Sequence, residues 1–287
     1  MPGRGWRLQR STIHPMPLLT LLTDFGLDDW YVAAVKGTVL RLAPGSQLVD
    51  IGHQVPPGDV ETAGFLLAAA YPSFPAGTVH LAVVDPGVGS ERRILAVRTA
   101  AGFLLAPDNG LLTSLLPRAE EIRSIEKSDL FLPSPGQTFH GRDRFAPVAS
   151  WLLRGEPFAD LGPVVDDLVR LPIEPPRREA DRLIGRVAHI DRYGNLVTDI
   201  PFEWIPERSS ETSPRVELET VYIRHSVERR ATCYAEIPAG EAAFLSGSLG
   251  TIELSLNGEN LARRWSVARG TAVRVLWINR PADVTLQ

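Results

Sequence analysis

A repeated alternation of short apolar runs with longer amphipathic segments constrains the fold of this chain more than any other feature of its sequence. Apolar runs at 18–22, 48–51 and 79–84 alternate with segments of helical character, the second of which begins at Asp59. A short apolar run bounded by turn residues is typical of a buried parallel strand, because both of its faces are covered. The strand–helix–strand–helix–strand order therefore predicts right-handed crossovers and an α/β domain with a mostly parallel, Rossmann-like sheet.

The rest of this first region contains further candidate elements. Asp28 and Asp29 precede the first helical segment, where acidic side chains commonly cap the free amides of a helix. Pro147 is compatible with a helix because proline is tolerated in the first turn. The other elements expected before residue 171 are a strand pair at 94–97 and 103–105, a short helix at 111–116 and a helix at 145–153.

A change in composition and hydrophobic pattern near residue 172 predicts a second, smaller domain. Segment 172–182 is rich in proline and charge, as linkers between domains often are. From 183 to 287, short alternating segments separated by Gly, Asn, Asp and Pro turns predict an antiparallel β-barrel. The first domain is therefore expected to span 17–171. Residues 1–16 contain basic residues but no long apolar run, and we expect a disordered extension there.

Composition and charge restrict the partners of the chain. Its 287 residues carry a formal net charge of −4, with a sequence pI near 5.9, which argues against binding of nucleic acid or an anionic membrane through bulk charge. No apolar run approaches the roughly 18–20 residues that span a bilayer. The single cysteine, Cys233, excludes an intrachain disulfide and fits a reducing compartment. The expected location is therefore the cytoplasm.

Asp24 is the first candidate ligand-binding residue. It lies just after the apolar run at 18–22, at the expected carboxyl end of a strand, where open α/β sheets bind their ligands. A carboxylate at this place can accept both hydrogens of a ribose cis-diol. The alternative is that Asp24 caps the following helix, a role for which Asp28 and Asp29 are already available.

A glycine-rich segment follows the third predicted strand. Asp85 comes directly after the run at 79–84 and precedes Pro-Gly-Val-Gly at 86–89, and glycines let a backbone approach a ligand closely. Arg92 lies far enough along the chain for the loop to fold back. An ion pair between the two side chains would keep the carboxylate charged. The alternative for Asp85 is an ordinary aspartate at a strand end.

A histidine in the segment Thr-Phe-His-Gly-Arg-Asp at 138–143 completes a candidate catalytic set. We expect His140 to lie in a loop. A lone histidine is more often structural than catalytic, and the adjacent glycine and charged residues are what favour a catalytic role. With Asp85 and Arg92 it would supply the carboxylate, guanidinium and imidazole that activate a small nucleophile such as water. His53, after the second strand, is a further residue that could line the same site.

Familiar metal and phosphate motifs are missing from the sequence. It contains no His-Glu-x-x-His, Cys-x-x-Cys or Asp-x-Asp-x-Asp pattern. Its glycine-rich segments fit neither the dinucleotide pattern Gly-x-Gly-x-x-Gly nor the phosphate-binding pattern that ends in Gly-Lys-Ser or Gly-Lys-Thr. We therefore expect no metal and no cofactor, and a nucleoside-like substrate without a polyphosphate.

With these residues in place, the chain resembles the S-adenosyl-L-methionine (SAM) hydroxide adenosyltransferases, adenosine-forming SAM hydrolases related to the fluorinase and chlorinase enzymes. The resemblance runs from about residue 18 to residue 278. The matching segments are Thr-Asp-Phe-Gly at 23–26, Val-Asp-Pro-Gly-Val-Gly at 84–89, Arg-Arg at 92–93, Ala-Pro-Asp-Asn-Gly-Leu-Leu at 106–112, the histidine segment at 138–143, Tyr-Gly-Asn at 193–195, and Gly247, Ser248, Gly250, Glu253 and Asn257.

The resemblance implies an N-terminal α/β domain, a C-terminal β-barrel and a homotrimer with SAM-binding sites between subunits. It also implies attack of water or hydroxide on C5′ of SAM to give adenosine and L-methionine, without a cofactor. The residues that it assigns to the site are Asp85, Arg92 and His140 for activation of water, Asp24 and Asn109 for the ribose, and Asp191, Asn195 and Ser248 for the methionine end.

The residue at position 85 distinguishes the SAM hydrolases from their halide-using relatives. The halide-using relatives carry a tyrosine where this chain has Asp85, and a carboxylate beside the reacting carbon would repel a halide anion but orient water. Three alternatives stay open: a halide-using SAM adenosyltransferase, a non-catalytic SAM- or adenosine-binding module, and a metal-dependent nucleoside hydrolase. The chain also departs from the family pattern at Leu249 and Thr251, where a small polar residue and an aromatic are usual, and this bears on the methionine contacts.

Overall fold

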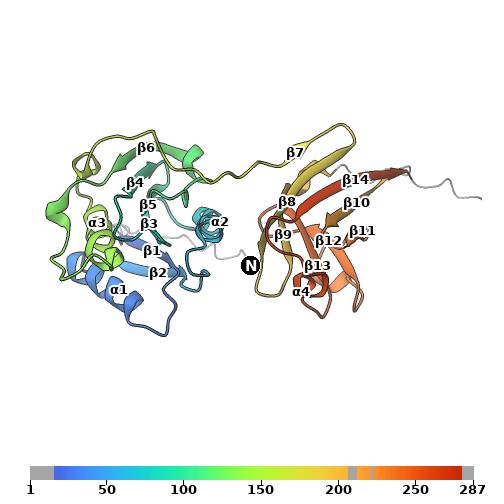
Figure 1. The fold of residues 1–287 in the computed structure, drawn as a ribbon, viewed down its shortest axis with the longest axis horizontal. Coiled ribbons are helices and arrows are strands. Elements are labelled where there is room, and N and C mark those ends of the chain that lie inside the picture. The colour runs from blue at the N-terminus through green and yellow to red at the C-terminus, as the bar shows by residue number, and fades with distance from the viewer. Residues whose placement is uncertain (1–15, 206–211, 221–222, 280–287) are drawn as a thin grey trace, which may run out of the picture. The chain divides into compact units, whose positions relative to one another are not determined.

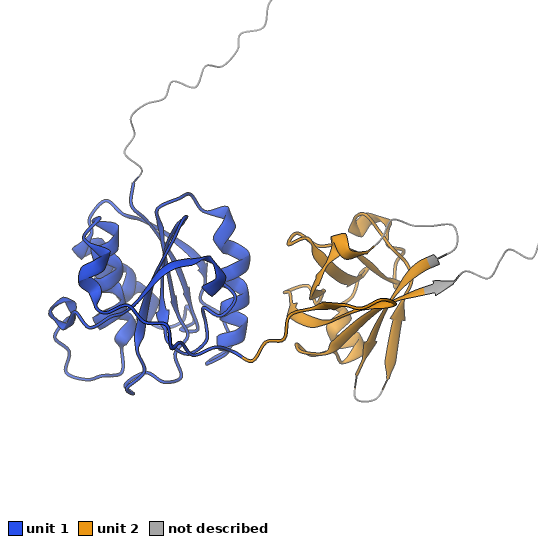
Figure 2. Cartoon of the chain, turned by 90° about the horizontal axis from the view of Figure 1, so that it is seen from above, with its two compact units in different colours: residues 1–171 blue, residues 172–287 orange. Residues whose placement is uncertain are grey.

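The computed structural model describes residues 16–205, 212–220 and 223–279. The chain forms two compact units, residues 1–171 and 172–287, which Figure 2 shows in different colours. Each unit has its own apolar core and is described by itself. The predicted disordered extension at 1–16 lies outside the described residues except for Met16.

A six-stranded mixed sheet forms the centre of the first unit (Figure 1). The strand order is β2-β1-β3-β5-β4-β6. The pairs β1–β2, β1–β3 and β3–β5 are parallel, whereas β4 pairs antiparallel with both β5 and β6. The predicted Rossmann-like sheet is thus confirmed, with an antiparallel edge. The strands are β1 (Leu18–Thr23), β2 (Gln47–Gly52), β3 (Thr78–Val83), β4 (Ile94–Thr99), β5 (Gly102–Pro107) and β6 (Ala119–Ser124).

Helices cover both faces of this sheet. Helices α1 (Tyr31–Leu42) and α3 (Ala146–Leu153) pack with alternate residues of β1 and β3 in one core cluster. Helix α2 (Val60–Ala70) packs in a second cluster with the other residues of those strands and with Leu111. The N-cap of α2 is Asp59, as predicted, and its side chain accepts a hydrogen bond from the amide of Thr62. Short helical turns of this unit are Tyr71–Ser73, Leu116–Arg118, Ser128–Leu130, Gly141–Phe145 and Phe158–Leu161.

Two local predictions about helix starts are wrong. Asp28 and Asp29 do not cap α1: its N-cap is Trp30, and no side chain there bonds to the free amides. His140 is not in a loop but is the N-cap of the π-helical turn Gly141–Phe145, which runs directly into α3. The turn residue Phe145 is fully buried. The packing of its ring against the sheet stabilises a helical conformation that the glycine and charged residues of this segment do not indicate.

The short helix predicted at 111–116 is also wrong. The chain makes successive turns there, and a 3-10 helix follows at Leu116–Arg118. The side-chain oxygen of Asn109 accepts a hydrogen bond from the amide of Leu111, and the hydroxyl of Thr113 donates to the carbonyl of Gly110. Such side-chain bonds to nearby backbone compete with helix formation, which explains why the leucine-rich pattern does not become an α-helix.

The second unit is an antiparallel sheet of eight strands that is nearly closed into a barrel. The order is β11-β10-β14-β8-β9-β13-β12, and β7 pairs with β8. An isolated bridge joins Arg230, just after β11, to Phe244 of β12, which brings the two ends of the sheet together. This confirms the predicted barrel. Its elements are β7 (Arg177–Arg178), β8 (Arg182–Ile190), β9 (Leu196–Pro201), β10 (Thr212–Glu219), β11 (Arg224–Val227), β12 (Ala242–Ser246), β13 (Thr251–Leu256), β14 (Ala272–Asn279), helix α4 (Leu261–Trp265), and 3-10 turns at Phe202–Trp204 and Tyr234–Glu236.

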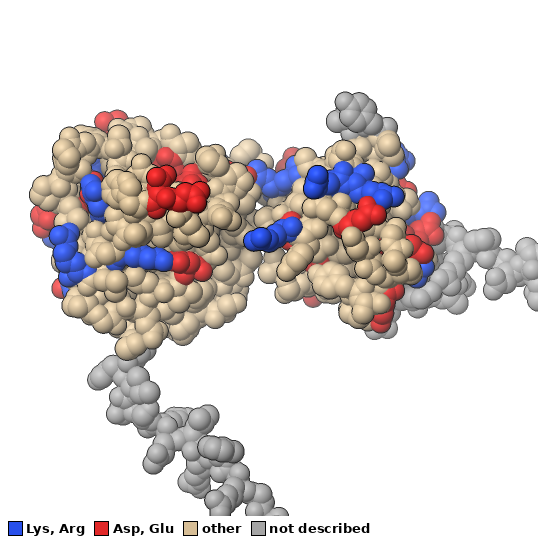
Figure 3. Space-filling model, turned by 90° about the horizontal axis from the view of Figure 1, so that it is seen from below, with Lys and Arg blue, Asp and Glu red and all other residues tan. Residues whose placement is uncertain are grey.

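Charged side chains of both signs are interspersed on the molecular surface. Figure 3 shows acidic groups close to basic groups on each unit, with uncharged areas between them. Arg229 pairs with Glu241 at 2.8 Å and Arg264 pairs with Glu259 at 2.7 Å, so these basic residues face carboxylates. Among the described helices, none has the length and apolarity needed to cross a membrane.

Candidate active site

A cavity of about 590 Å³ lies at the carboxyl ends of strands in the first unit. Asp24 comes directly after β1, and Asp85 comes shortly after β3. Because β1 and β3 are parallel neighbours, their carboxyl ends bring both carboxylates to the same edge of the sheet. His140, which precedes the turn into α3, also lines this cavity. The fold therefore collects three of the predicted side chains from segments that are far apart in the sequence.

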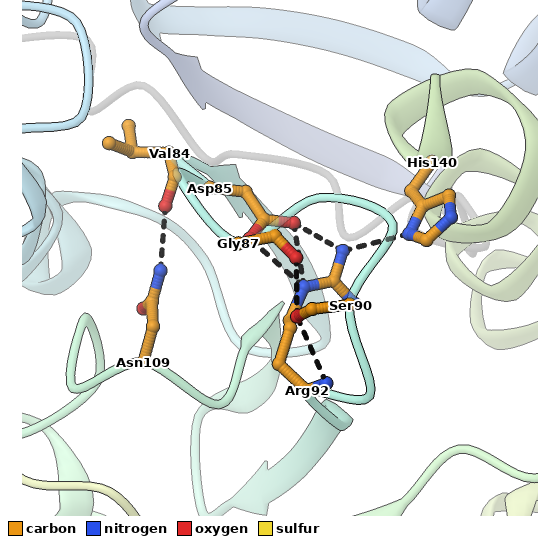
Figure 4. Close-up of polar contacts among 7 residues, drawn as sticks. All are labelled: Val84, Asp85, Gly87, Ser90, Arg92, Asn109 and His140. Carbon is orange, nitrogen blue, oxygen red and sulfur yellow. Dashed lines mark hydrogen bonds and ion pairs between the residues drawn. The ribbon is translucent and has the colours of Figure 1, made fainter. Parts of the chain in front are cut away.

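The predicted ion pair between Asp85 and Arg92 is present and buried (Figure 4). The Asp85 side chain is 4% exposed and that of Arg92 is 9% exposed. The Nε of Arg92 donates to both carboxylate oxygens, at 2.9 and 2.8 Å, and Nη2 donates to Oδ2 as well. Two successive turns fold the loop back, because the amide of Val88 bonds to the carbonyl of Asp85 and that of Ser90 to the carbonyl of Gly87.

Arg92 stands between Asp85 and His140. Its Nη2 also donates to Nδ1 of His140 at 2.9 Å, so Nδ1 accepts and the ring proton of a neutral imidazole is on Nε2. Burial, together with the positive charges of Arg144 and Arg92, lowers the pKa of His140 to about 4. The imidazole is therefore neutral at neutral pH. Its Nε2 is buried and has no hydrogen-bond partner in the part of the chain that the structure describes.

One carboxylate oxygen of Asp24 has no hydrogen bond to any described residue. Its Oδ2 accepts a hydrogen bond from the amide of Gly58 at 2.9 Å, while no described residue bonds to Oδ1. The alternative that Asp24 caps α1 is wrong, because its bond is to the loop before α2. The carboxylate is thus fixed at one oxygen and available to a ligand at the other.

Asn109 supports the loop that carries Asp85. Its Nδ2 donates to the carbonyl of Val84 at 2.8 Å (Figure 4), and its Oδ1 accepts from the amide of Leu111. Both ends of the amide are thus used within the protein. The contact that this geometry shows directly is with the backbone next to Asp85.

Four aromatic rings form a wall of the cavity that the sequence analysis missed. Phe25, Trp30, Tyr31 and Phe139 line it, and their ring centroids lie 4.9–6.1 Å apart in tilted or edge-to-face contacts. The guanidinium of Arg142 lies 5.0 Å from the Phe139 ring centroid. The available signal was that these aromatics lie inside or just after the two motifs at 23–26 and 138–143.

Two predicted residues of the second unit share a different cavity. Asp191 and Asn195 line a cavity of about 440 Å³ in that unit, together with Tyr193 and Tyr234. Asp191 organises the loop: Oδ1 accepts from the amides of Tyr193 and Asn195, and Oδ2 accepts from the Asn195 side chain at 2.9 Å. Ser248 is exposed in the turn between β12 and β13 and does not line this cavity.

Gly194 is required in the loop that carries Asp191. Its φ is +88°, a conformation that L side chains rarely adopt, and a Cβ there would lie 2.1 Å from Cγ of Asn260. Asn260 is the N-cap of α4, with its side chain accepting from the amide of Arg263. The glycine therefore lets the loop pack directly against the start of this helix.

The described residues contain no cluster of three or more His, Cys, Asp or Glu side chains that could hold a metal ion. Two domain families match the chain: the SAM hydroxide adenosyltransferase N-terminal domain over residues 19–162, and the corresponding C-terminal domain over residues 185–274. The chain belongs to the SAM hydroxide adenosyltransferase family. The family resemblance predicted from the sequence motifs is thereby confirmed.

Relatives of this chain cover both of its units. An (R)-S-adenosyl-L-methionine hydrolase from Salinispora tropica is 38% identical, over 91% of this chain and 98% of the relative. A fluorinase from Nocardia brasiliensis is more distant, at 28% identity over 90% of this chain and 96% of the relative. The crystal structure of an uncharacterized conserved protein from Thermotoga maritima has the same fold, with a TM-score of 0.82, 32% identity and coverage of 90% of this chain and 99% of the other.

Proposed function

We propose that this protein is a SAM hydrolase, in which the oxygen of water attacks C5′ of SAM and the products are adenosine and L-methionine. The observation that carries the proposal is the hydrogen-bonded set of Asp85, Arg92 and His140. This set is buried at the edge of a cavity that Asp24 also lines. The name of the Salinispora tropica relative supports the same reaction.

With SAM as the substrate, the step that needs catalysis is activation of the nucleophile. SAM carries a sulfonium, so methionine leaves as a neutral thioether and needs no general acid. As the oxygen–C5′ bond forms and the C5′–sulfur bond breaks, one proton of water must go to a base. We assign that base to Asp85, whose carboxylate passes the proton on to solvent. Positioned proton acceptance typically contributes 10²–10⁴-fold in rate, and alignment of water with C5′ contributes more.

Arg92 and His140 act on Asp85 and on the water in different ways. The guanidinium holds both oxygens of Asp85 and keeps the carboxylate charged. Neutral His140 accepts from the same guanidinium, which fixes its plane. The remaining N–H of His140, at Nε2, is the donor that we assign to the oxygen of the attacking water.

The other predicted residues belong to substrate binding in this proposal. Asp24 binds the ribose hydroxyls, Asn109 supports the ribose side of the site, and the domain at 17–171 holds the catalytic groups. The family resemblance supports a homotrimer with sites between subunits and a reaction without a cofactor. The single cysteine supports a cytoplasmic location. The residues assigned to the methionine end are Asp191, Asn195 and Ser248.

Incubation with SAM in ¹⁸O-labelled water, with a chelator present, tests the reaction. Mass analysis of the nucleoside should show adenosine that carries ¹⁸O at the 5′ position. Unlabelled adenosine would mean that the nucleophile is not water, and 5′-chloroadenosine in chloride buffer would assign the chain to the halide-using branch. Unreacted SAM retained in a stable complex would show that the protein is a non-catalytic binding module.

A further inference from the structure

A buried histidine outside the cavity is bonded to the segment that carries Asp24. His53 is 4% exposed and follows β2. Its Nδ1 lies 2.9 Å from the hydroxyl of Thr23, the last residue of β1. On the other side of the ring, Nε2 lies 3.1 Å from Oδ1 of Asp50, whose Oδ2 accepts from Lys36 at 2.6 Å. His53 is not among the residues that line the cavity.

The neighbours of the ring determine the direction of these contacts. The Nε2–Asp50 contact is an electrostatic one rather than an aligned hydrogen bond, but the carboxylate favours the tautomer with the proton on Nε2. Nδ1 then accepts from the hydroxyl of Thr23. The Thr23 oxygen in turn accepts from the amide of Phe25 at 3.3 Å. Hydrogen bonds therefore connect Nδ1 of His53, through the hydroxyl of Thr23, to the backbone beside Asp24, while Nε2 faces the charge of Asp50.

The backbone of His53 makes a second bond to the same segment. Its carbonyl accepts from the amide of Gly26 at 2.7 Å. Gly26 has φ of +69°, a conformation that favours glycine, so the segment turns sharply after Phe25. His53 thus holds the residues on both sides of Asp24, one through its ring and one through its carbonyl.

A second pair of the same chemistry lies in the same sheet but away from the cavity. The hydroxyl of Thr20 lies 2.8 Å from Nδ1 of His80, and both residues are buried. Thr20 and His80 are register partners in β1 and β3, and the His80 ring packs against Tyr71 and Phe74. This pair offers an internal control, because it shares the bond and the burial but does not bond to the segment at 23–26.

We propose that His53 is a positioning residue that, through Thr23 and Gly26, holds the Asp24 carboxylate in place for the hydroxyls of a ribose. The inference rests on the proposed function, in which Asp24 binds the ribose of SAM. Gly58 fixes one oxygen of Asp24, and His53 fixes the backbone from which that carboxylate projects.

Binding of two nucleosides to the full-length protein separates positioning from general stability. The variants are Thr23→Val and, as the matched control, Thr20→Val. Calorimetry would measure the affinities for adenosine and for 2′,3′-dideoxyadenosine, which lacks the diol. We expect Thr23→Val to weaken adenosine binding about tenfold or more, toward the affinity for the dideoxy compound, and to leave binding of the dideoxy compound unchanged. Thr20→Val should change neither affinity, although both variants should lose similar thermal stability.

Two further variants keep the test decisive if Thr23→Val does not fold. Thr23→Ser retains the hydroxyl and should restore adenosine binding, and Asp50→Asn, at a half-exposed position, should weaken adenosine binding in the same selective way but less. Equal weakening of both nucleosides, or no change, would overturn the role of His53. If the unaltered protein does not prefer adenosine over the dideoxy compound, the ribose role of Asp24 fails instead. The binding readout needs no turnover, so it is independent of the ¹⁸O experiment.

Discussion

A guanidinium placed between a carboxylate and an imidazole gives each of the three groups a separate task. Arg92 carries a permanent charge and cannot accept a proton. His140 is neutral, and its Nδ1 is already occupied by the Arg92 bond. Of the three side chains, Asp85 is therefore the one suited to take a proton from water. Because Arg92 lies between the other two side chains, His140 influences Asp85 through Arg92.

Asp85→Asn should lower kcat by about 10²-fold or more, because the carboxamide cannot accept the proton. The KM for SAM should change by less than about threefold, since the amide still fills the same space. Steady-state kinetics with SAM would measure both. Equal losses in kcat and in SAM affinity would show that Asp85 serves binding instead of proton transfer.

The lowered pKa of His140 makes a prediction about pH. The folded protein keeps this ring neutral down to pH about 4, whereas the unfolded chain protonates it below its ordinary pKa of 6.5. Between these values the unfolded state binds more protons, so the free energy of unfolding falls as the pH is lowered from 6.5 to 4. Relative to His140→Gln, the native protein should lose on the order of 1–2 kcal/mol between pH 7 and pH 5.

Urea unfolding of both proteins at the two pH values measures that difference. The same reasoning expects the kcat of the native enzyme to show no inflection near pH 6.5 from His140. A fall of kcat centred near pH 6.5 that disappears in His140→Gln would contradict a neutral imidazole.

One buried carboxylate connects the end of the first unit to the loops that carry Arg92 and Asn109. The side chain of Asp108 is 4% exposed and accepts from Arg93, at 2.6 and 2.9 Å, and from the amide of Val169. Arg93 also donates to Asp167 at 2.6 Å. Because Arg93 follows Arg92 and Asp108 precedes Asn109, the segment before residue 171 supports the backbone on both sides of the candidate site.

Asp108→Ala should lower the free energy of unfolding by about 1.5–3 kcal/mol, because it removes the charged acceptor of the Val169 amide and of Nε of Arg93. The matched control is Asp167→Ala, which removes a carboxylate that is 78% exposed and should change stability much less, because exposed ion pairs are screened by solvent. Chemical denaturation of the two variants gives the comparison. Similar losses in both would mean that the surface ion pair, and not the buried carboxylate, anchors the segment.

Elements with a strong local pattern were predicted well, and those set by tertiary packing were not. Strands β1 and β3 are mostly apolar and were found from the sequence, whereas the edge strand β6 reads Ala-Glu-Glu-Ile-Arg-Ser and has no clear alternation. The spacing of Asp85 and Arg92 predicted their ion pair. The contact of Arg92 with His140 was not predictable, because it depends on how the turn before α3 packs against the loop after β3.

At the scale of the whole chain, the candidate residues fall into two groups that belong to different units. Asp24, Asp85 and His140 line the cavity of the first unit, while Asp191 and Asn195 line that of the second. Local sequence patterns found the members of both groups. The proposal that the groups act together on one substrate comes from the family resemblance, because no local sequence pattern indicates how subunits are arranged.

A mixture of two inactive variants tests the proposed shared site. The chain mass is 31.4 kDa, so light scattering should give about 94 kDa for a homotrimer. Asp85→Asn and Asn195→Ala should each be nearly inactive alone. Co-expressed, they should regain about a quarter of full activity, because some sites then combine two unaltered halves. A mixture that stays inactive, with each variant correctly assembled, would place each complete site within one subunit.

The aromatic wall of the first cavity has a spectroscopic consequence. Trp30 is 55% exposed and packs edge-on against Phe139, with centroids 5.3 Å apart. A ligand that fills the cavity displaces water from this indole, which shifts its fluorescence emission to shorter wavelength. The chain has six tryptophans, and subtraction of the Trp30→Phe spectrum isolates the one at the wall. The cavity thereby contains an intrinsic optical reporter of its own occupancy.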